Sequence, residues 1–293
     1  MITNHSQPNI LAPIHALARS MVFRLVPETD PWPALDRLAA QFDTSWGVIG
    51  LGDSLVRTLG REVPGLRPFP ALTGAGCSVP STQQALWVSL GDDDAGVLFD
   101  RAEWIKGALA PYLVLEDDLP LFRYAGGRDL TGYEDGTENP TGDAGVEAAI
   151  AAVPAAITGS SFVAVQRWIH DLAHFHTHSS GECDAMIGRR RDTNEELDDA
   201  PESAHVKRTA QESYTPEAFM VRRSMPWATA FAQGLEFVAF GNSLDAYERV
   251  LRRMVGHEDG IVDSLFRFSR PVTGGYYWCP PVRDGRLDLS FLI

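Results

Sequence analysis

The two halves of the chain carry the same order of expected secondary-structure elements. In the first half, apolar periodicity and β-branched runs predict strand, helix, strand, strand, helix, strand over residues 20–25, 33–42, 46–51, 86–90, 95–110 and 121–124. In the second half, the same order is expected over residues 161–165, 168–178, 219–224, 236–240, 244–255 and 275–279. A βαββαβ order that occurs twice predicts an α+β fold of two ferredoxin-like domains with antiparallel sheets, of the dimeric α+β barrel type.

The expected boundary between the halves lies near residue 150. A chain of 293 residues has room for two domains of about 150 residues each. We therefore expect an N-terminal domain over residues 1–150 and a C-terminal domain over residues 151–293. Residues 126–158 join the halves, and the polar, acidic residues 181–215 interrupt the second one. An insertion of that length without regular structure is usually functional or disordered.

The charge of the chain excludes some classes of partner. The sequence has 25 Lys and Arg against 39 Asp and Glu, a formal charge of −14, which argues against nucleic acid or an anionic membrane as a partner. No apolar run is long enough for a membrane span, and residues 1–8 lack the features of a secretion signal. Three scattered cysteines, Cys77, Cys183 and Cys279, do not form a disulfide framework pattern. We expect a cytoplasmic protein.

The segment from Gly132 to Pro140, with the sequence GYEDGTENP, indicates a functional loop. Glycines on both sides of Asp135 allow backbone conformations closed to other residues and a close approach to a flat ligand. Asn139 and Pro140 stiffen the end of the same loop. An acidic surface turn is the alternative, and it would be preferred if the Gly-x-x-Asp-Gly pattern stood alone.

Two further stretches add polar groups suited to chemistry. His205 lies in the polar insertion, where a solvated surface histidine is the default interpretation. Arg222 and Ser224 alternate with Val221 and Arg223 on a predicted strand, so Arg222 and Ser224 face the same side. They need a polar partner if that face is covered, whereas an edge-strand arginine that faces water is an equally good interpretation.

Taken together, these residues resemble the dye-decolorizing peroxidase family of haem enzymes. The resemblance rests on Gly132-x-x-Asp135-Gly136 with its Thr-Glu-Asn-Pro continuation, on His205, and on the run from Arg222 to Pro226. The segments 7–13 and 186–189 also resemble the family, so the ordered set covers nearly the whole chain. The chain is most similar to the bacterial class B group, although many members have asparagine where Ser224 stands.

The resemblance implies a haem-dependent peroxidase that reduces hydrogen peroxide through a ferryl intermediate and oxidises dyes and phenols. It implies one haem b per chain, with His205 as the iron ligand and with Asp135, Arg222 and Ser224 as catalytic residues on the distal side. Further cofactor contacts are expected from Arg222, Gly136, Thr137, Glu138 and Arg189. A carboxylate usually holds the second nitrogen of such a histidine, and Asp263 is the candidate, with an ordinary loop aspartate as the alternative. The enzyme is expected to be a homo-oligomer.

Two other functions compete with this interpretation. His170, His174 and His178 recur every four residues, so on one helix they would share a face, a spacing that can ligate zinc or another divalent metal. A solvated helix face is preferred, because no Glu or Cys ligand lies beside them. The second competitor is a non-catalytic haem-binding or haem-trafficking protein of the same fold. Such a carrier needs an iron ligand, but it has no use for Asp135 and Arg222 together.

Overall fold

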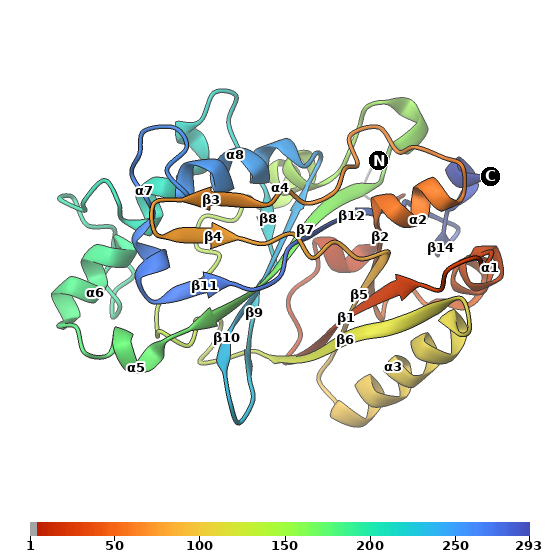
Figure 1. Cartoon of the computed structure of the whole chain (residues 1–293), viewed down its shortest axis with the longest axis horizontal. Helices are drawn as coiled ribbons and strands as arrows, with labels where there is room; N and C mark the ends of the chain where they lie inside the picture. Colours follow the sequence, from red (N-terminus) through yellow and green to blue (C-terminus); the bar gives the residue numbers. More distant parts are fainter. Residues whose placement is uncertain (1–4) are drawn as a thin grey trace.

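The structure, a computed structural model, describes residues 5–293, so residues 1–4 of the expected N-terminal domain lie outside the description. The elements of the first half follow the predicted order (Figure 1). Its strands and helices are β1 (Leu17–Leu25), α1 (Trp32–Gln41), β2 (Gly47–Leu51), α2 (Asp53–Thr58), β3 (Leu72–Gly74), β4 (Cys77–Val79), β5 (Leu86–Asp92), α3 (Ala95–Leu109) and β6 (Leu113–Phe122).

The second half follows after α4 (Gly142–Ala149) and repeats the pattern with a larger insertion. Its elements are β7 (Ser161–His170), α5 (Leu172–Phe175), α6 (Ser180–Ile187), α7 (His205–Thr209), β8 (Val221–Arg222), β9 (Met225–Ala228), β10 (Gln233–Gly241), α8 (Asp245–Met254), β11 (Ser269–Pro271) and β12 (Gly275–Cys279). The hairpin of β13 (Val282–Arg283) and β14 (Arg286–Leu287) follows near the C-terminus.

The strand order confirms two ferredoxin-like halves. The main sheet runs β6-β1-β5-β2-β12-β7-β10-β8, with β9 and β11 paired to its side. In each half, the fourth strand of the βαββαβ unit lies next to the first, followed by the third and the second. The pairings along this path are antiparallel. The halves meet where Trp278 of β12 pairs with Leu51 of β2. The domain boundary at residue 150 stays a prediction.

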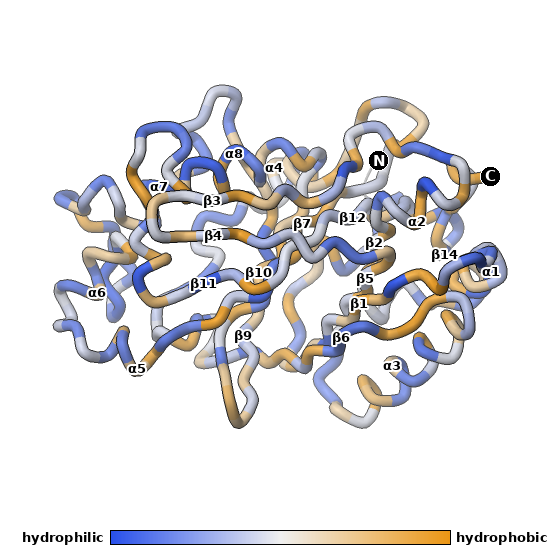
Figure 2. The backbone as a smooth tube through the Cα atoms, in the orientation of Figure 1, coloured by the Kyte–Doolittle hydropathy of each residue, from blue (hydrophilic) through white to orange (hydrophobic). Residues whose placement is uncertain are grey.

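Each half has a pair of packed helices, but the first helix of the pair is shorter in the second half than in the first. Helix α1 packs against α3 in the first half, and α7 packs against α8 in the second. Helix α3 buries Leu98, Ala102, Ile105 and Leu109, and Figure 2 shows hydrophobic and hydrophilic residues interspersed along it. Helix α1 has ten residues and α7 has five, so α7 covers less of the sheet.

The helix predicted over residues 168–178 is wrong. Strand β7 continues to His170, because Ile169 pairs with Gly234 of β10 and His170 pairs with Ser269 of β11. Only residues 172–175 are helical, so His170, His174 and His178 do not share one helix face. Within residues 5–293, no group of three or more His, Cys, Asp or Glu side chains could hold a metal ion. The zinc interpretation has no support in this geometry.

Other differences concern element length. The strand expected over residues 219–224 is only Val221–Arg222, and β9 follows it as a separate strand. The strand expected over residues 121–124 is β6, which begins at Leu113. The insertion 181–215 contains α6 and α7 rather than a structureless loop. None of the helices found between residues 5 and 293 is long and apolar enough to cross a membrane.

Candidate active site

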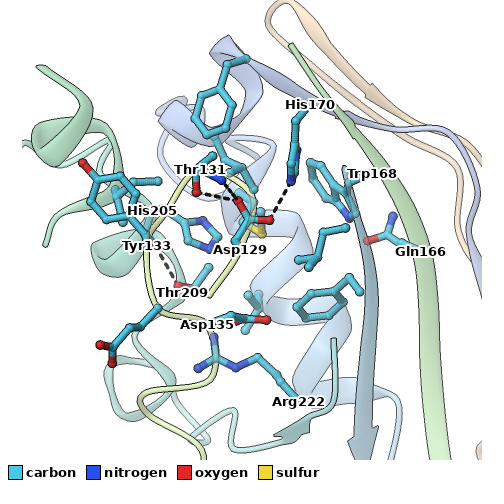
Figure 3. Close-up of a pocket in the computed structure, with 18 of the residues that line it drawn as sticks. Asp129, Thr131, Tyr133, Asp135, Gln166, Trp168, His170, His205, Thr209 and Arg222 are labelled. Carbon is cyan, nitrogen blue, oxygen red and sulfur yellow. Dashed lines mark hydrogen bonds and ion pairs between the residues drawn. The ribbon is translucent and has the colours of Figure 1, made fainter. Parts of the chain in front are cut away.

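A cavity of about 960 Å³ lies in the C-terminal half, between the sheet, α8 and the loop that carries Asp135 (Figure 3). Apolar side chains from β7, β10, α8 and neighbouring segments form much of the wall: Trp168, Leu235, Phe237, Val250, Met254, Leu265 and Phe268. Polar side chains also line the cavity, and they include His205, Asp129, Asp135 and Arg222.

His205 is the first residue of α7, and Asp263 fixes its ring. The Nδ1 atom of His205 lies 2.8 Å from Oδ2 of Asp263, whose side chain is fully buried. The other oxygen, Oδ1, accepts a hydrogen bond from Leu265 N at 2.8 Å, so both carboxylate oxygens have a partner. Ser264 binds Ser203 through both main-chain and hydroxyl atoms, which holds the two loops together. The Nε2 atom of His205 is therefore the ring nitrogen left for a ligand.

The charges around His205 act on its pKa. Burial alone would lower the pKa of His205, but the Asp263 carboxylate and its hydrogen bond outweigh burial and raise it. Asp135 raises the same pKa further, whereas Arg222 lowers it, so both groups lie within electrostatic range of the ring. Figure 3 shows His205 above Asp135 and Arg222 in that view, all at the same cavity.

Asp135 lies in a loop whose shape depends on glycine and asparagine. Its Oδ1 accepts a hydrogen bond from Gly136 N at 2.7 Å. Gly136 has a φ of 73°, and a Cβ atom there would lie 3.1 Å from Nδ2 of Asn139. Asn139 in turn binds the main chain of Arg222 twice: it accepts from Arg222 N and donates to Arg222 O, both at 2.8 Å. The loop thus fixes Asp135 and Arg222 relative to one another.

Arg222 brings an unpaired buried atom to the site. Its main chain pairs with Ala239 on β10, and its side chain lines the cavity. The Nε atom is buried and has no hydrogen-bond partner within residues 5–293. Buried charged groups are normally paired, so this guanidinium is suited to an anionic or polar ligand in the cavity.

Ser224 lies next to this pair but outside the main cavity. It is buried, and its Oγ accepts a long hydrogen bond of 3.5 Å from Val238 N. Ser224 lines a second cavity of about 550 Å³, whose walls also include Asp135 and Arg222. The two cavities therefore meet at the same carboxylate and guanidinium.

Four residues expected to contact the cofactor do not line the main cavity: Gly136, Thr137, Glu138 and Arg189. The Arg189 guanidinium binds Glu138 at 2.6 Å and Glu196 at 3.3 Å. Thr137 Oγ1 accepts a hydrogen bond from Asn194 at 3.0 Å. These contacts tie the Asp135 loop to residues 189–196.

The sequence interpretation missed a buried pair at the cavity wall, Asp129 and His170. His170 Nε2 lies 3.0 Å from Asp129 Oδ1, and His170 Nδ1 lies 2.7 Å from Ser269 Oγ. The other oxygen of Asp129 accepts from Thr131 N at 2.8 Å and from its hydroxyl at 2.5 Å. Burial alone would raise the pKa of Asp129, but bonds from His170 and Thr131 lower it. The spacing Asp-x-Thr indicates such a turn in sequence, although it does not indicate His170.

The fold and the cavity together define a class of protein. One imidazole, held by a buried carboxylate, projects into an apolar cavity that also contains a second carboxylate and a guanidinium. A histidine with its second nitrogen held in this way is typical of an iron ligand, and the facing acid–base and cationic groups suit peroxide chemistry. The class is that of the haem peroxidases.

Comparisons with known proteins identify the family. Residues 126–284 match the family model for the C-terminal domain of Dyp-type peroxidases. The chain is 30% identical over 281 residues to a dye-decolorizing peroxidase of Rhodococcus erythropolis, covering 93% of this chain and 78% of the relative. It is 29% identical over 279 residues to a dye-decolorizing peroxidase of Mycobacterium tuberculosis, covering 93% and 79%.

Comparison with solved structures supports the same family. A variant of DypB from Rhodococcus jostii RHA1 in complex with haem superposes with a TM-score of 0.85 at 27% identity, covering 92% of this chain and 94% of that one. A dye-decolorizing protein from Vibrio cholerae gives a TM-score of 0.83 at 27% identity, covering 92% and 95%. The chain therefore belongs to the Dyp-type peroxidase family and is a haem-dependent peroxidase.

Proposed function

We propose that the cavity binds one haem b per chain through Nε2 of His205. The observation that carries this proposal is the pair of His205 and Asp263, because Nδ1 is engaged at 2.8 Å and only Nε2 is left for the iron. Asp263 accepts the proton of Nδ1, which fixes the tautomer and makes Nε2 a stronger ligand. The apolar wall and the unpaired Nε of Arg222 fit a flat macrocycle with anionic groups at its edge.

Asp135 is proposed as the group that moves protons. When bound, the haem supplies an iron at which hydrogen peroxide accepts two electrons. Asp135 Oδ1 is engaged by Gly136 N, so Oδ2 takes a proton from one peroxide oxygen and returns it to the other, which leaves as water. The bond from Gly136 also keeps the carboxylate from turning away from the cavity.

Arg222 is proposed to stabilise the negative charge that grows on the departing oxygen. A guanidinium keeps its charge at every relevant pH and needs no proton transfer to act. Because Asn139 holds the main chain of Arg222 on both sides, little reorganisation is needed when peroxide enters. Ser224 is proposed to hydrogen-bond water or peroxide in the adjoining 550 Å³ cavity.

Arg189, Thr137 and Glu138 are proposed to support cofactor binding by holding the loop rather than through the main cavity wall. The support is the ion pair of Arg189 with Glu138 and the bond from Asn194 to Thr137. Gly136 contributes through its positive φ and through its N–H to Asp135.

The oxidant is proposed to be hydrogen peroxide, and the reductants to be dyes, phenols and similar aromatic one-electron donors. The names of the curated relatives support dyes as donors. Cytoplasmic localisation, expected from the sequence, and homo-oligomeric assembly, expected from the family resemblance, stay predictions. A haem carrier of the same fold is disfavoured, since Asp135 and Arg222 both line the cavity and the relatives are peroxidases.

The test of this function compares two histidine variants. His205→Ala should lose the haem Soret band and the peroxide-dependent oxidation of phenols, whereas His174→Ala, at an exposed histidine on α5, should retain both. Haem content per chain and visible spectra measure the outcome. A His205→Ala protein with full haem content and an unaltered ligand-field spectrum would remove His205 from the iron.

A further inference from the structure

A depression of about 870 Å³ opens on the surface directly outside the haem cavity. It lies between the end of β7, the turn that joins β9 to β10, and residues 266–270. His170 and Phe268 line both the depression and the cavity. Only one layer of side chains separates the two spaces at this point.

Aromatic side chains make up this shared wall. The ring of Phe266, which lines the depression, lies 5.4 Å from the ring of Trp168, which lines the cavity. The rings of His170 and Phe268 lie 6.1 Å apart in the same wall. Trp168 is buried, and tryptophan is among the side chains that lose an electron most readily, so the wall provides a short route for electrons.

The surface of the depression combines aromatic and cationic groups. Phe231, in the β9–β10 turn, is 98% exposed, and Figure 2 shows this turn as a hydrophobic tip that projects from the body of the protein. Arg267 and Arg270 line the depression and are exposed, and Glu182 of α6 is the carboxylate within electrostatic range of Arg267. Asp171 is the acidic side chain among the residues that line the depression. The residues that line the depression therefore carry a net positive charge, although the formal charge of the whole chain is −14.

We propose that this depression binds anionic aromatic electron donors, such as phenols that carry a carboxylate or sulfonate. The donor ring packs against Phe231 and Phe266, and its anionic group binds Arg267 and Arg270. This inference rests on the proposed function, since it names the substrate class of the same peroxidase. Charge complementarity favours an anionic donor at this depression, because the net negative charge of the protein repels anions and the two arginines attract them.

The electron balance of the reaction is complete. Each phenol gives one electron through the Phe266–Trp168 contact and releases its hydroxyl proton to water, and a phenoxyl radical remains. Two such steps supply two electrons and two protons, which together with one hydrogen peroxide give two molecules of water. The donor never enters the cavity, so large dyes can react as well as small phenols.

The test uses three phenols of nearly equal size that differ in charge: 4-hydroxyphenylacetate (anionic), 2-(4-hydroxyphenyl)ethanol (neutral) and tyramine (cationic). In the holoenzyme with Arg267→Glu and Arg270→Glu, kcat/KM for the anionic phenol should fall about tenfold, and that for tyramine should rise. The neutral phenol should change less than twofold. A control with Arg37→Glu and Arg286→Glu changes the net charge equally beside α1 and α3, where Arg37 donates to the main-chain carbonyl of Gly107 and Arg286 to that of Ala40. It should leave the preference unchanged.

A second variant separates donor binding from assembly. Phe231→Ala should raise KM for all three phenols and for a sulfonated anthraquinone dye, with Phe99→Ala, at an exposed residue of α3, as the control. The oligomeric state is measured for both variants by analytical ultracentrifugation. If Phe231→Ala changes the oligomeric state and leaves the donor kinetics unaltered, the depression is an interface between copies of the chain and the proposal is overturned.

The peroxide half-reaction is measured separately, as the Soret change on mixing with hydrogen peroxide without a donor. All variants should react with peroxide at the wild-type rate. A missing reaction in the wild type would overturn the proposed function itself. An intact peroxide reaction with an unaltered donor preference in the double glutamate variant would overturn only the donor site.

Discussion

Glu236 is a buried carboxyl on the far side of the cavity wall, and replacing it should change how stability depends on pH. It lies on β10 between Leu235 and Phe237, which line the cavity, while its own side chain accepts from Ser20 Oγ at 2.8 Å and lies 3.7 Å from Arg167 Nε. Burial raises the pKa of Glu236 to about 7, and the charge of Asp117 adds to the rise.

The raised pKa of Glu236 sets the sign and the approximate size of its effect on stability. Between the unfolded pKa near 4.5 and the folded value near 7, the folded state holds the proton more tightly. The carboxyl therefore contributes stability below the unfolded value that is lost as pH rises through 7. A shift of this size corresponds to about 3 kcal/mol, of which about 2 to 3 kcal/mol falls between pH 5 and pH 8.

Glu236→Gln keeps the acceptor for Ser20 but removes the titration. The variant also loses the attraction between Glu236 and Arg167. The comparison therefore uses the change of the unfolding free energy with pH rather than its absolute value. Urea unfolding followed by circular dichroism from pH 5 to pH 8 should show the variant gaining about 2 to 3 kcal/mol on the wild type. Glu116→Gln, at a half-exposed glutamate of β6, is the control and should follow the wild type. Parallel stability curves for wild type and Glu236→Gln would refute the reasoning.

Three further predictions concern the site. The first concerns the rate at which the haem-loaded variants react with peroxide in stopped-flow mixing. Arg222→Ala should be slower than wild type by about 10³ or more, Asp135→Ala by about 10², and Ser224→Ala should be slowed least, because only Arg222 supplies a fixed charge. A near wild-type rate for Arg222→Ala would reverse this order. Asp263→Asn should retain haem but shift the iron–histidine stretching frequency in resonance Raman spectra to lower values, since the ligand loses its carboxylate partner; an unshifted band would contradict this pairing. Asp129→Asn should destabilise the fold at pH 7, and the difference should shrink as pH falls below the ordinary aspartate pKa, because the stability that comes from the lowered pKa of Asp129 is lost as the carboxylate takes up a proton there; urea midpoints at pH 7 and pH 3 measure this effect.

The fold was largely predictable from local patterns, and the failures have a common cause. Strand β12 and helix α8 were predicted within one residue at each end, because their apolar periodicity is complete within the segment. Residues 168–178 failed because β7 extends through pairings with β10 and β11, which lie far away in the chain. The position at which β8 ends and β9 begins also depends on how both strands pair with β10.

The site was predictable where a motif marks it. The GYEDGTENP loop, His205 and Arg222 were chosen by their resemblance to a family, and the structure brings Asp135, His205 and Arg222 to one cavity. The pair of Asp129 and His170 was missed, since the two residues are 41 positions apart and meet only in the folded chain. His170 also looked like a solvated helical residue, whereas it is 4% exposed at the end of a strand.

The short helix α7 distinguishes the second half of this duplicated chain, whose elements form most of the cavity wall, from the first half. In the first half, α1 fills the space beside α3 with ten residues, whereas α7 has five beside α8. At a rise of about 1.5 Å per residue, α7 lacks about 8 Å of helix that α1 supplies in the first half. His205, which lines the cavity, is the first residue of the shortened helix. Lengthening α7 by five residues toward its N-terminus, to the length of α1, should therefore narrow the cavity.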